Sequence, residues 1–100
     1  MIRKTRWAVA LAFLMAAAPA KAGSTGDLYR LCTGNNPFEL GYCMGYVAGI
    51  WPGLSCDVGN PTNGALEQAF KNWAAKHPEK WSLPAWLGVG EALRTTWPCH

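Results

Sequence analysis

Apolar residues recur at helical spacing through much of the chain. The clearest stripe has members at i, i+3, i+4, i+7 and i+8, namely Leu66, Ala69, Phe70, Trp73 and Ala74. Polar residues fill the positions between them, as expected for a helix with one face on a protein core. Thr62 or Asn63 offers the N-cap of this helix, and His77 and Pro78 end it, because the residue before a proline resists the α conformation.

Three further segments show the same period. The first runs from Thr25 to Cys32, and the second runs from about Phe38 to Trp51, directly after Pro37, which suits a first helical turn. A polar loop, Leu54 to Pro61, separates this second segment from the helix above.

The last helix is predicted to start at Ser82, a candidate N-cap. Its apolar side would consist of Leu83, Trp86, Leu87, Gly90, Leu93 and Trp97. No segment alternates with a period of two, so we predict no strand. Helices joined by short connections tend to be antiparallel, and the predicted fold is therefore all-α, a small four-helix up-down bundle.

The chain opens with the features of a secretory signal peptide. A basic start through Arg6 precedes an apolar run from Trp7 to Ala18, and Ala20-Lys21-Ala22 provides the small residues that signal peptidase recognises. The apolar run is too short for a membrane span, which needs about 17–25 residues. We predict a signal peptide over residues 1–22, a helical domain over 23–100, a periplasmic location, and no membrane association after cleavage.

All four cysteines follow the predicted cleavage site. Their gaps are too wide for the close pairs of a zinc site, so we predict two disulfides in an oxidising compartment and no metal. In an antiparallel bundle, Cys32 and Cys43 fall at one end and Cys56 and Cys99 at the other. A disulfide needs Cα atoms within about 7 Å, which favours these two pairings.

Glycines lie four residues apart at Gly41, Gly45 and Gly49, along one face of the second predicted helix. Each costs about 1 kcal/mol relative to alanine in a helix interior. We interpret the face as a helix-packing surface that lets another helix approach closely, either within the fold or across a homodimer.

The sequence offers little catalytic chemistry. His77 and His100 are its only histidines, no thiol would be left to pair with them, and the six acidic residues are dispersed. Four of the nine basic residues precede position 23, which leaves five basic against six acidic residues, a net charge of −1, in the remainder. We predict no enzyme, no cofactor and no nucleic-acid partner.

Tryptophans are the conspicuous feature of the predicted mature chain. Trp73, Trp86 and Trp97 fall on apolar stripes and are predicted to be core residues. Trp81 lies in a polar connection, where either a local packing contact or an interface anchor would explain it.

Several motifs together resemble the Rap/Tai family of immunity proteins. They are Leu28-Tyr29-Arg30-Leu31-Cys32, Cys43-Met44-Gly45-Tyr46-Val47-Ala48-Gly49, Cys56, Lys76-His77-Pro78-Glu79, Ala92-Leu93 and Trp97-Pro98-Cys99. The resemblance implies a small exported helical protein that binds and blocks a peptidoglycan amidase effector of type VI secretion.

The function expected from this resemblance is steric inhibition of that cell-wall amidase toxin in the periplasm. The predicted partner-binding residues lie on the third helix and the connection after it: Glu67, Lys71, His77, Glu79 and Trp81. Two alternatives stay open, a periplasmic acid-stress chaperone and a subunit of an envelope complex. A large rise in apolar-dye binding at low pH would favour the chaperone.

Overall fold

The computed structural model describes residues 23–54 and 59–99. Within them it contains α2 (Thr25–Thr33), α3 (Pro37–Ile50), α4 (Asn63–Lys76) and α5 (Ala85–Thr96), with two 3₁₀ helices, η1 (Trp51–Leu54) and η2 (Pro78–Lys80). The described part has no strand, only an isolated bridge between Ser24 and Pro84. The predicted all-α class is confirmed, whereas the predicted signal peptide lies outside the described residues.

Three helices begin at side-chain caps. The Asn36 side chain accepts hydrogen bonds from the first turn of α3, directly before Pro37, and the Thr62 hydroxyl accepts one from the amide of Ala65 in α4. Such caps satisfy amide groups that have no partner within the helix. The predicted cap at Thr62 is confirmed.

The cap predicted for the last helix is wrong. Helix α5 begins at Ala85, and the N-cap position is Pro84, which makes no side-chain cap hydrogen bond. The amide of Ala85 instead donates to the carbonyl oxygen of Gly23, at 3.4 Å. A contact from a distant part of the chain therefore replaces the local cap that Ser82 was expected to give.

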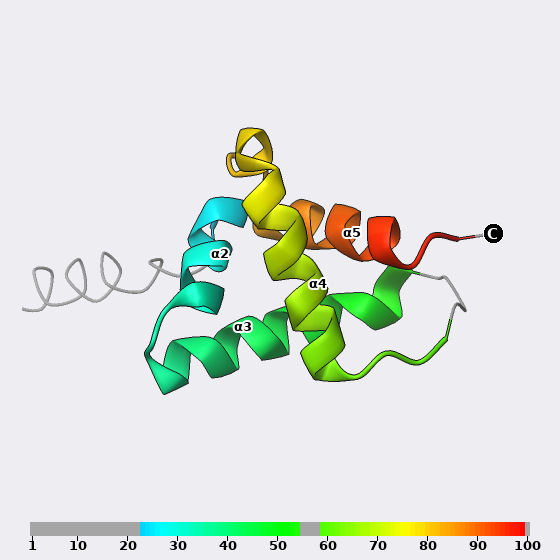
Figure 1. Ribbon diagram of the computed structural model, residues 1–100, viewed down its shortest axis with the longest axis horizontal. Coiled ribbons are helices and arrows are strands. Elements are labelled where there is room, and N and C mark those ends of the chain that lie inside the picture. The colour runs from blue at the N-terminus through cyan, green and yellow to red at the C-terminus, as the bar shows by residue number, and fades with distance from the viewer. Residues whose placement is uncertain (1–22, 55–58, 100) are drawn as a thin grey trace, which may run out of the picture.

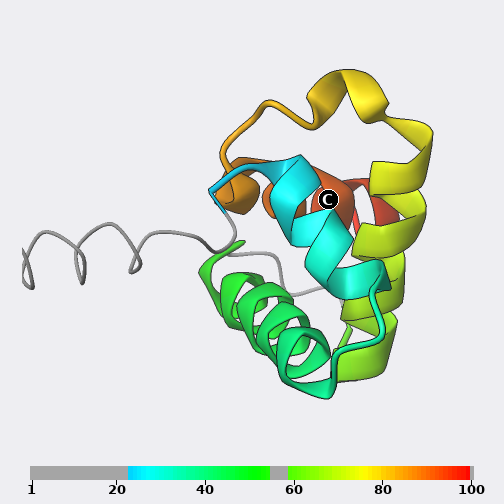
Figure 2. The same ribbon diagram turned by 90° about the vertical axis from the view of Figure 1, so that its left-hand side faces the viewer.

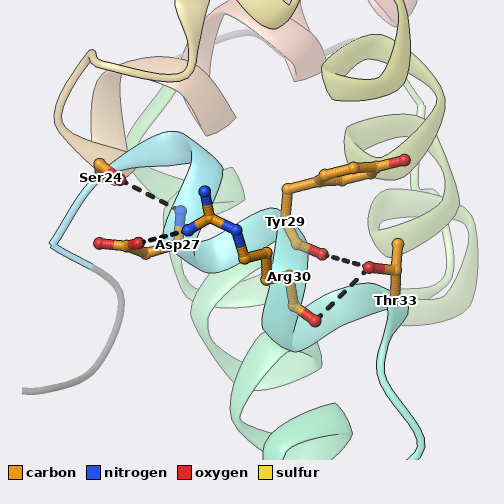
Figure 3. Close-up of polar contacts among 5 residues, drawn as sticks. All are labelled: Ser24, Asp27, Tyr29, Arg30 and Thr33. Atoms are coloured by element: carbon orange, nitrogen blue, oxygen red, sulfur yellow. Dashed lines mark hydrogen bonds and ion pairs between the residues drawn. The ribbon is translucent and has the colours of Figure 1, made fainter.

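Helix α2 is short and has a dense set of local polar contacts (Figure 3). The Ser24 hydroxyl accepts from the amide of Asp27, and the guanidinium of Arg30 lies 2.8 Å from the Asp27 carboxylate. At the other end, the Thr33 hydroxyl donates to the carbonyl oxygen of Tyr29. A helix of this length is marginal on its own, so these bonds and its packing against other helices sustain it.

The helices cross one another instead of aligning. In Figure 1, α3 and α5 run across the view in the same direction, while α4 crosses them steeply, and Figure 2 shows α4 upright again. The predicted up-down bundle is therefore not confirmed. The connections that flank α4, residues 51–62 and 77–84, are long enough to release consecutive helices from the antiparallel arrangement that short loops impose.

The core lies where the four helices meet. Its largest fully buried side chains, drawn from all four helices, are Phe70, Leu28, Leu66, Leu93, Val47 and Val89. Leu54 is also buried, in η1, so the prediction that the polar loop starts at this residue is wrong. Trp73 is buried as predicted, and the half-buried Trp97 packs edge-on against Trp51.

A disulfide joins α2 to α3. Cys32 and Cys43 are bonded, with their Cα atoms 5.2 Å apart, and both side chains are buried, which confirms the first predicted pairing. Cys99 is also disulfide-bonded, but its predicted partner Cys56 lies outside the described residues, so the second pairing stays a prediction.

The N-termini of α2 and α5 are fastened together. The Thr25 side chain is fully buried, its hydroxyl lies 3.0 Å from the carbonyl oxygen of Leu83, and its amide donates to the same oxygen at 2.8 Å. Gly88 allows this approach, because a Cβ built there would collide with Thr25. Packing this close requires small residues on α5.

The core face of α5 is consequently not the predicted one. Its buried residues are Ala85, Gly88, Val89, Gly90, Ala92 and Leu93. Trp86, predicted to be a core residue, is 57% exposed, and its neighbour Leu87 is 40% exposed. Gly88 faces Thr25 of α2, Gly90 faces Leu54 of η1, and the two large side chains are exposed.

Candidate functional site, an apolar groove between α3 and α5

Helix α3 carries apolar residues on two opposite faces. Cys43 and Val47 are fully buried, while Phe38 and Tyr42, on the other side of the helix, are 76% and 37% exposed. Among its fourteen residues, Glu39 is the only charged one. Helix α3 therefore turns an apolar and nearly uncharged face outward.

The glycine face of α3 belongs to this open side. A Cβ built at Gly41, Gly45 or Gly49 would meet no atom within 4 Å. The expectation that another helix of the same fold packs on these glycines is therefore wrong within the described residues. The homodimer alternative is not tested by this finding and stays a prediction.

The open side of α3 leads into a groove of about 480 Å³ at its C-terminal end. Residues of α3, η1 and α5 line it: Gly49, Ile50, Gly53, Leu54, Trp86, Leu87, Gly90, Glu91 and Arg94. The volume falls in the range of small-molecule and side-chain binding pockets. Apolar and glycine residues make up most of the lining, with two charged residues on α5.

Exposed large side chains and glycines together shape the groove. Trp86 and Leu87 stand out from α5, whereas Gly49 and Gly53 have open space where a Cβ would be. An exposed tryptophan beside a hollow is typical of an interface anchor, because its ring offers a large contact area at a low entropic cost.

The two charged residues of the groove differ in their partners. The Glu91 carboxylate lies 3.8 Å from the ammonium group of Lys80. Arg94 forms no ion pair with any residue that the structure describes. The groove therefore presents a guanidinium group that is still free to pair with a carboxylate.

The predicted partner-binding residues Glu67 and Lys71 are not on an exposed side of α4. They are separated by 3.7 Å, and their side chains are only 14% and 28% exposed. At spacing i, i+4 and i+7 they share a face with Ala74, which is fully buried. The ion pair borders the core, and a role of these two residues in partner binding stays a prediction.

The other predicted partner residues cluster around η2. The Nδ1 atom of His77 lies 3.0 Å from a carboxylate oxygen of Glu79. A backbone hydrogen bond at Glu79, and then the one with His77, lower the pKa of the exposed Glu79 carboxyl below its ordinary value of 4.5. No predicted partner residue lines the α3–α5 groove.

Trp81, directly after η2, packs against neighbouring parts of the fold. Its indole N–H donates to the carbonyl oxygen of Ala74 at 2.8 Å, and its ring lies 5.4 Å from that of Tyr29. The ring is half-buried over Gly26. Local packing, one of the two interpretations of this residue, is what the structure shows, and a role in partner binding is untested.

The residues that sequence reasoning missed are Phe38 and Trp86. For Phe38 the available signal is the second apolar face of α3, where residues 38, 42, 45 and 49 follow the helical period with no charge among them. For Trp86 the signal is the parallel series of small residues Ala85, Gly88 and Ala92, which competes with the bulky stripe for the core.

The described residues hold no cluster of three or more His, Cys, Asp or Glu side chains that could bind a metal ion. The groove lining contains no serine, threonine, cysteine or histidine. No helix in the described ranges is long and apolar enough to cross a membrane. The arrangement is that of a small helical protein with an apolar surface suited to binding a partner.

A comparison with protein families identifies the family of this protein. The chain matches the family model of the Rap1a immunity proteins over residues 24–99, which is most of its length, and it belongs to that family. No curated protein and no solved structure matched it. The family membership agrees with the Rap/Tai resemblance of the sequence motifs and supports an immunity role.

Proposed function

We propose that this protein is a periplasmic immunity protein that binds a peptidoglycan amidase effector of type VI secretion and blocks it sterically. The observation that carries the proposal is the family match over residues 24–99. The amidase as target follows from the Rap/Tai resemblance, and the periplasm follows from the signal features of residues 1–22.

The described surface supports binding of a protein partner. An exposed apolar face on α3 and exposed Trp86 on α5 adjoin one groove. Aromatic residues of this kind are enriched at protein interfaces, where burying them on association contributes much of the affinity. Steric occlusion asks no chemistry of the inhibitor, only a stable scaffold and a complementary surface.

A protection experiment tests the proposal. Bacteria are made to export a candidate amidase effector to the periplasm, with or without the full-length chain, and lysis is followed. We expect full-length chain to prevent lysis and a variant lacking residues 1–22 to fail, because it would not reach the toxin. Lysis at an unchanged rate, with the folded chain recovered from the periplasm, would contradict the proposal for that effector.

A further inference from the structure

We propose that the α3–α5 groove binds a toxin segment in which an apolar side chain lies next to a carboxylate. The identity of the partner rests on the proposed function above. The chemistry of the segment rests on the groove itself. The groove is about 480 Å³ in volume and opens beside the exposed side chains of Trp86 and Leu87.

The apolar part of the occupant follows from the walls. Ile50 and Leu54 line one side of the groove and Trp86 and Leu87 the other. Since Trp86 is 57% exposed and Leu87 40% exposed, the chain itself leaves much of this apolar area in contact with water. Burying it against an aromatic or large aliphatic side chain removes that contact.

The carboxylate follows from charge complementarity. Arg94 lines the groove and has no ion-pair partner among the described residues, while Glu91 already has the ammonium group of Lys80 nearby, at 3.8 Å. A guanidinium group binds a carboxylate through two parallel hydrogen bonds, which fixes the orientation of the partner. The free charge of the groove is thus positive, and an acidic group complements it.

The glycines of α3 supply a matched pair of variants. Gly41 and Gly49 both lie on the open face, with no atom within 4 Å of a built Cβ, but only Gly49 lines the groove. Leucine at either position favours the helix over glycine. Gly49→Leu therefore fills the groove in a folded protein, and Gly41→Leu controls for the changed surface.

The chemistry is tested with two probes that need no toxin. N-acetyl-phenylalanine carries an aromatic ring and a carboxylate, and N-acetyl-phenylalanine amide lacks the charge. In an NMR titration of the protein, we expect the acid to shift the Trp86 indole and Gly90 amide signals. Arg94→Gln should weaken the binding of the acid by about three- to tenfold and leave the binding of the amide unchanged. Gly49→Leu should abolish the binding of both, and Gly41→Leu should not.

Three outcomes would overturn the inference. Equal binding of the acid and the amide by the unaltered protein would show that the groove does not recognise a carboxylate. NMR shifts at residues outside the groove would show that the probes bind elsewhere. Equal effects of the two glycine variants on probe binding would show the same. Shifts of the groove signals, those of the Trp86 indole and the Gly90 amide, that grow with protein concentration alone would indicate a second copy of the chain as the occupant. Failure of the protection experiment with normal probe binding would reject the toxin target but not the groove chemistry.

Discussion

Gly88 leaves less room for a side chain than any other described glycine, because Thr25 lies against it, and this contact was not foreseen from the sequence. A Cβ at Gly88 would collide with the Thr25 side chain, which is fully buried and bonded to the carbonyl oxygens of Leu83 and Pro84. Rigid hydrogen-bonded neighbours cannot give way cheaply. We expect Gly88→Ala to lower the free energy of unfolding by about 1–3 kcal/mol, measured by urea denaturation.

Gly45→Ala is the matched control for this variant, since a Cβ there meets open space. It should raise the free energy of unfolding by up to about 1 kcal/mol, because alanine favours a helix over glycine. If both variants stabilise the protein, the contact with Thr25 is not a close one.

Tyr46 on α3 gives a second prediction at this scale. Burial, and then the nearby Tyr42, raise the pKa of its phenol above the ordinary value of 10.0. Because the folded state favours the neutral phenol, the stabilisation is fully present below 10.0 and is lost as the pH rises through the raised pKa.

The change that tests Tyr46 is Tyr42→Phe, which removes the second cause. We expect the pKa of Tyr46 to fall but to stay above 10.0, since burial is the larger cause. Tyrosinate absorbance against pH measures this, with Tyr46→Phe identifying the signal. A Tyr46 pKa that is unchanged in Tyr42→Phe would show that the ring contact at 6.1 Å carries no electrostatic effect.

Among the elements, those with local signals were predictable and those fixed by distant contacts were not. Pro37 and Thr62 mark the starts of α3 and α4, because a proline ring and a capping hydroxyl act within one turn. The start of α5 depends on the carbonyl of Gly23, and its core face depends on the approach of α2. Neither is encoded in the residues of α5 alone.

The disulfide between α2 and α3 leads to a prediction for the pair of elements. Replacing both Cys32 and Cys43 by alanine releases a loop closed over a separation of 11 residues. The entropy of that loop in the unfolded chain corresponds to about 3 kcal/mol. We expect a loss of this size in urea unfolding, with α2 showing the greatest rise in amide hydrogen exchange, because it is only nine residues long.

Reduction of the unaltered protein provides the control for the paired alanine variant. Dithiothreitol should destabilise the unaltered protein more than the variant, which has lost one of the targets of reduction. A variant that unfolds at the same urea concentration as the unaltered protein would mean that packing alone holds α2 on α3.

At the scale of the whole molecule, the candidate site was predictable only in its components. The tryptophans and the glycine face were visible in the sequence, but the α3–α5 groove arises because α5 buries its small residues, with Gly88 against Thr25 of α2, and leaves Trp86 exposed. None of the predicted partner-binding residues on α4 and around η2 lines that groove. The molecule thus offers two surfaces on which a toxin could bind.

Two tryptophan variants distinguish these surfaces. Trp86→Ser removes an exposed ring from the groove, so we expect normal stability and a loss of toxin affinity of about 2 kcal/mol or more, as for other interface anchors. Trp81→Phe removes the hydrogen bond to Ala74, which should lower the free energy of unfolding by about 1 kcal/mol and leave affinity unchanged. Calorimetric titration with the amidase, alongside urea unfolding, measures both quantities. The reverse result, with affinity lost in Trp81→Phe and kept in Trp86→Ser, would place the toxin interface around η2 and not at the groove. The Trp81 indole would then contribute to both stability and binding.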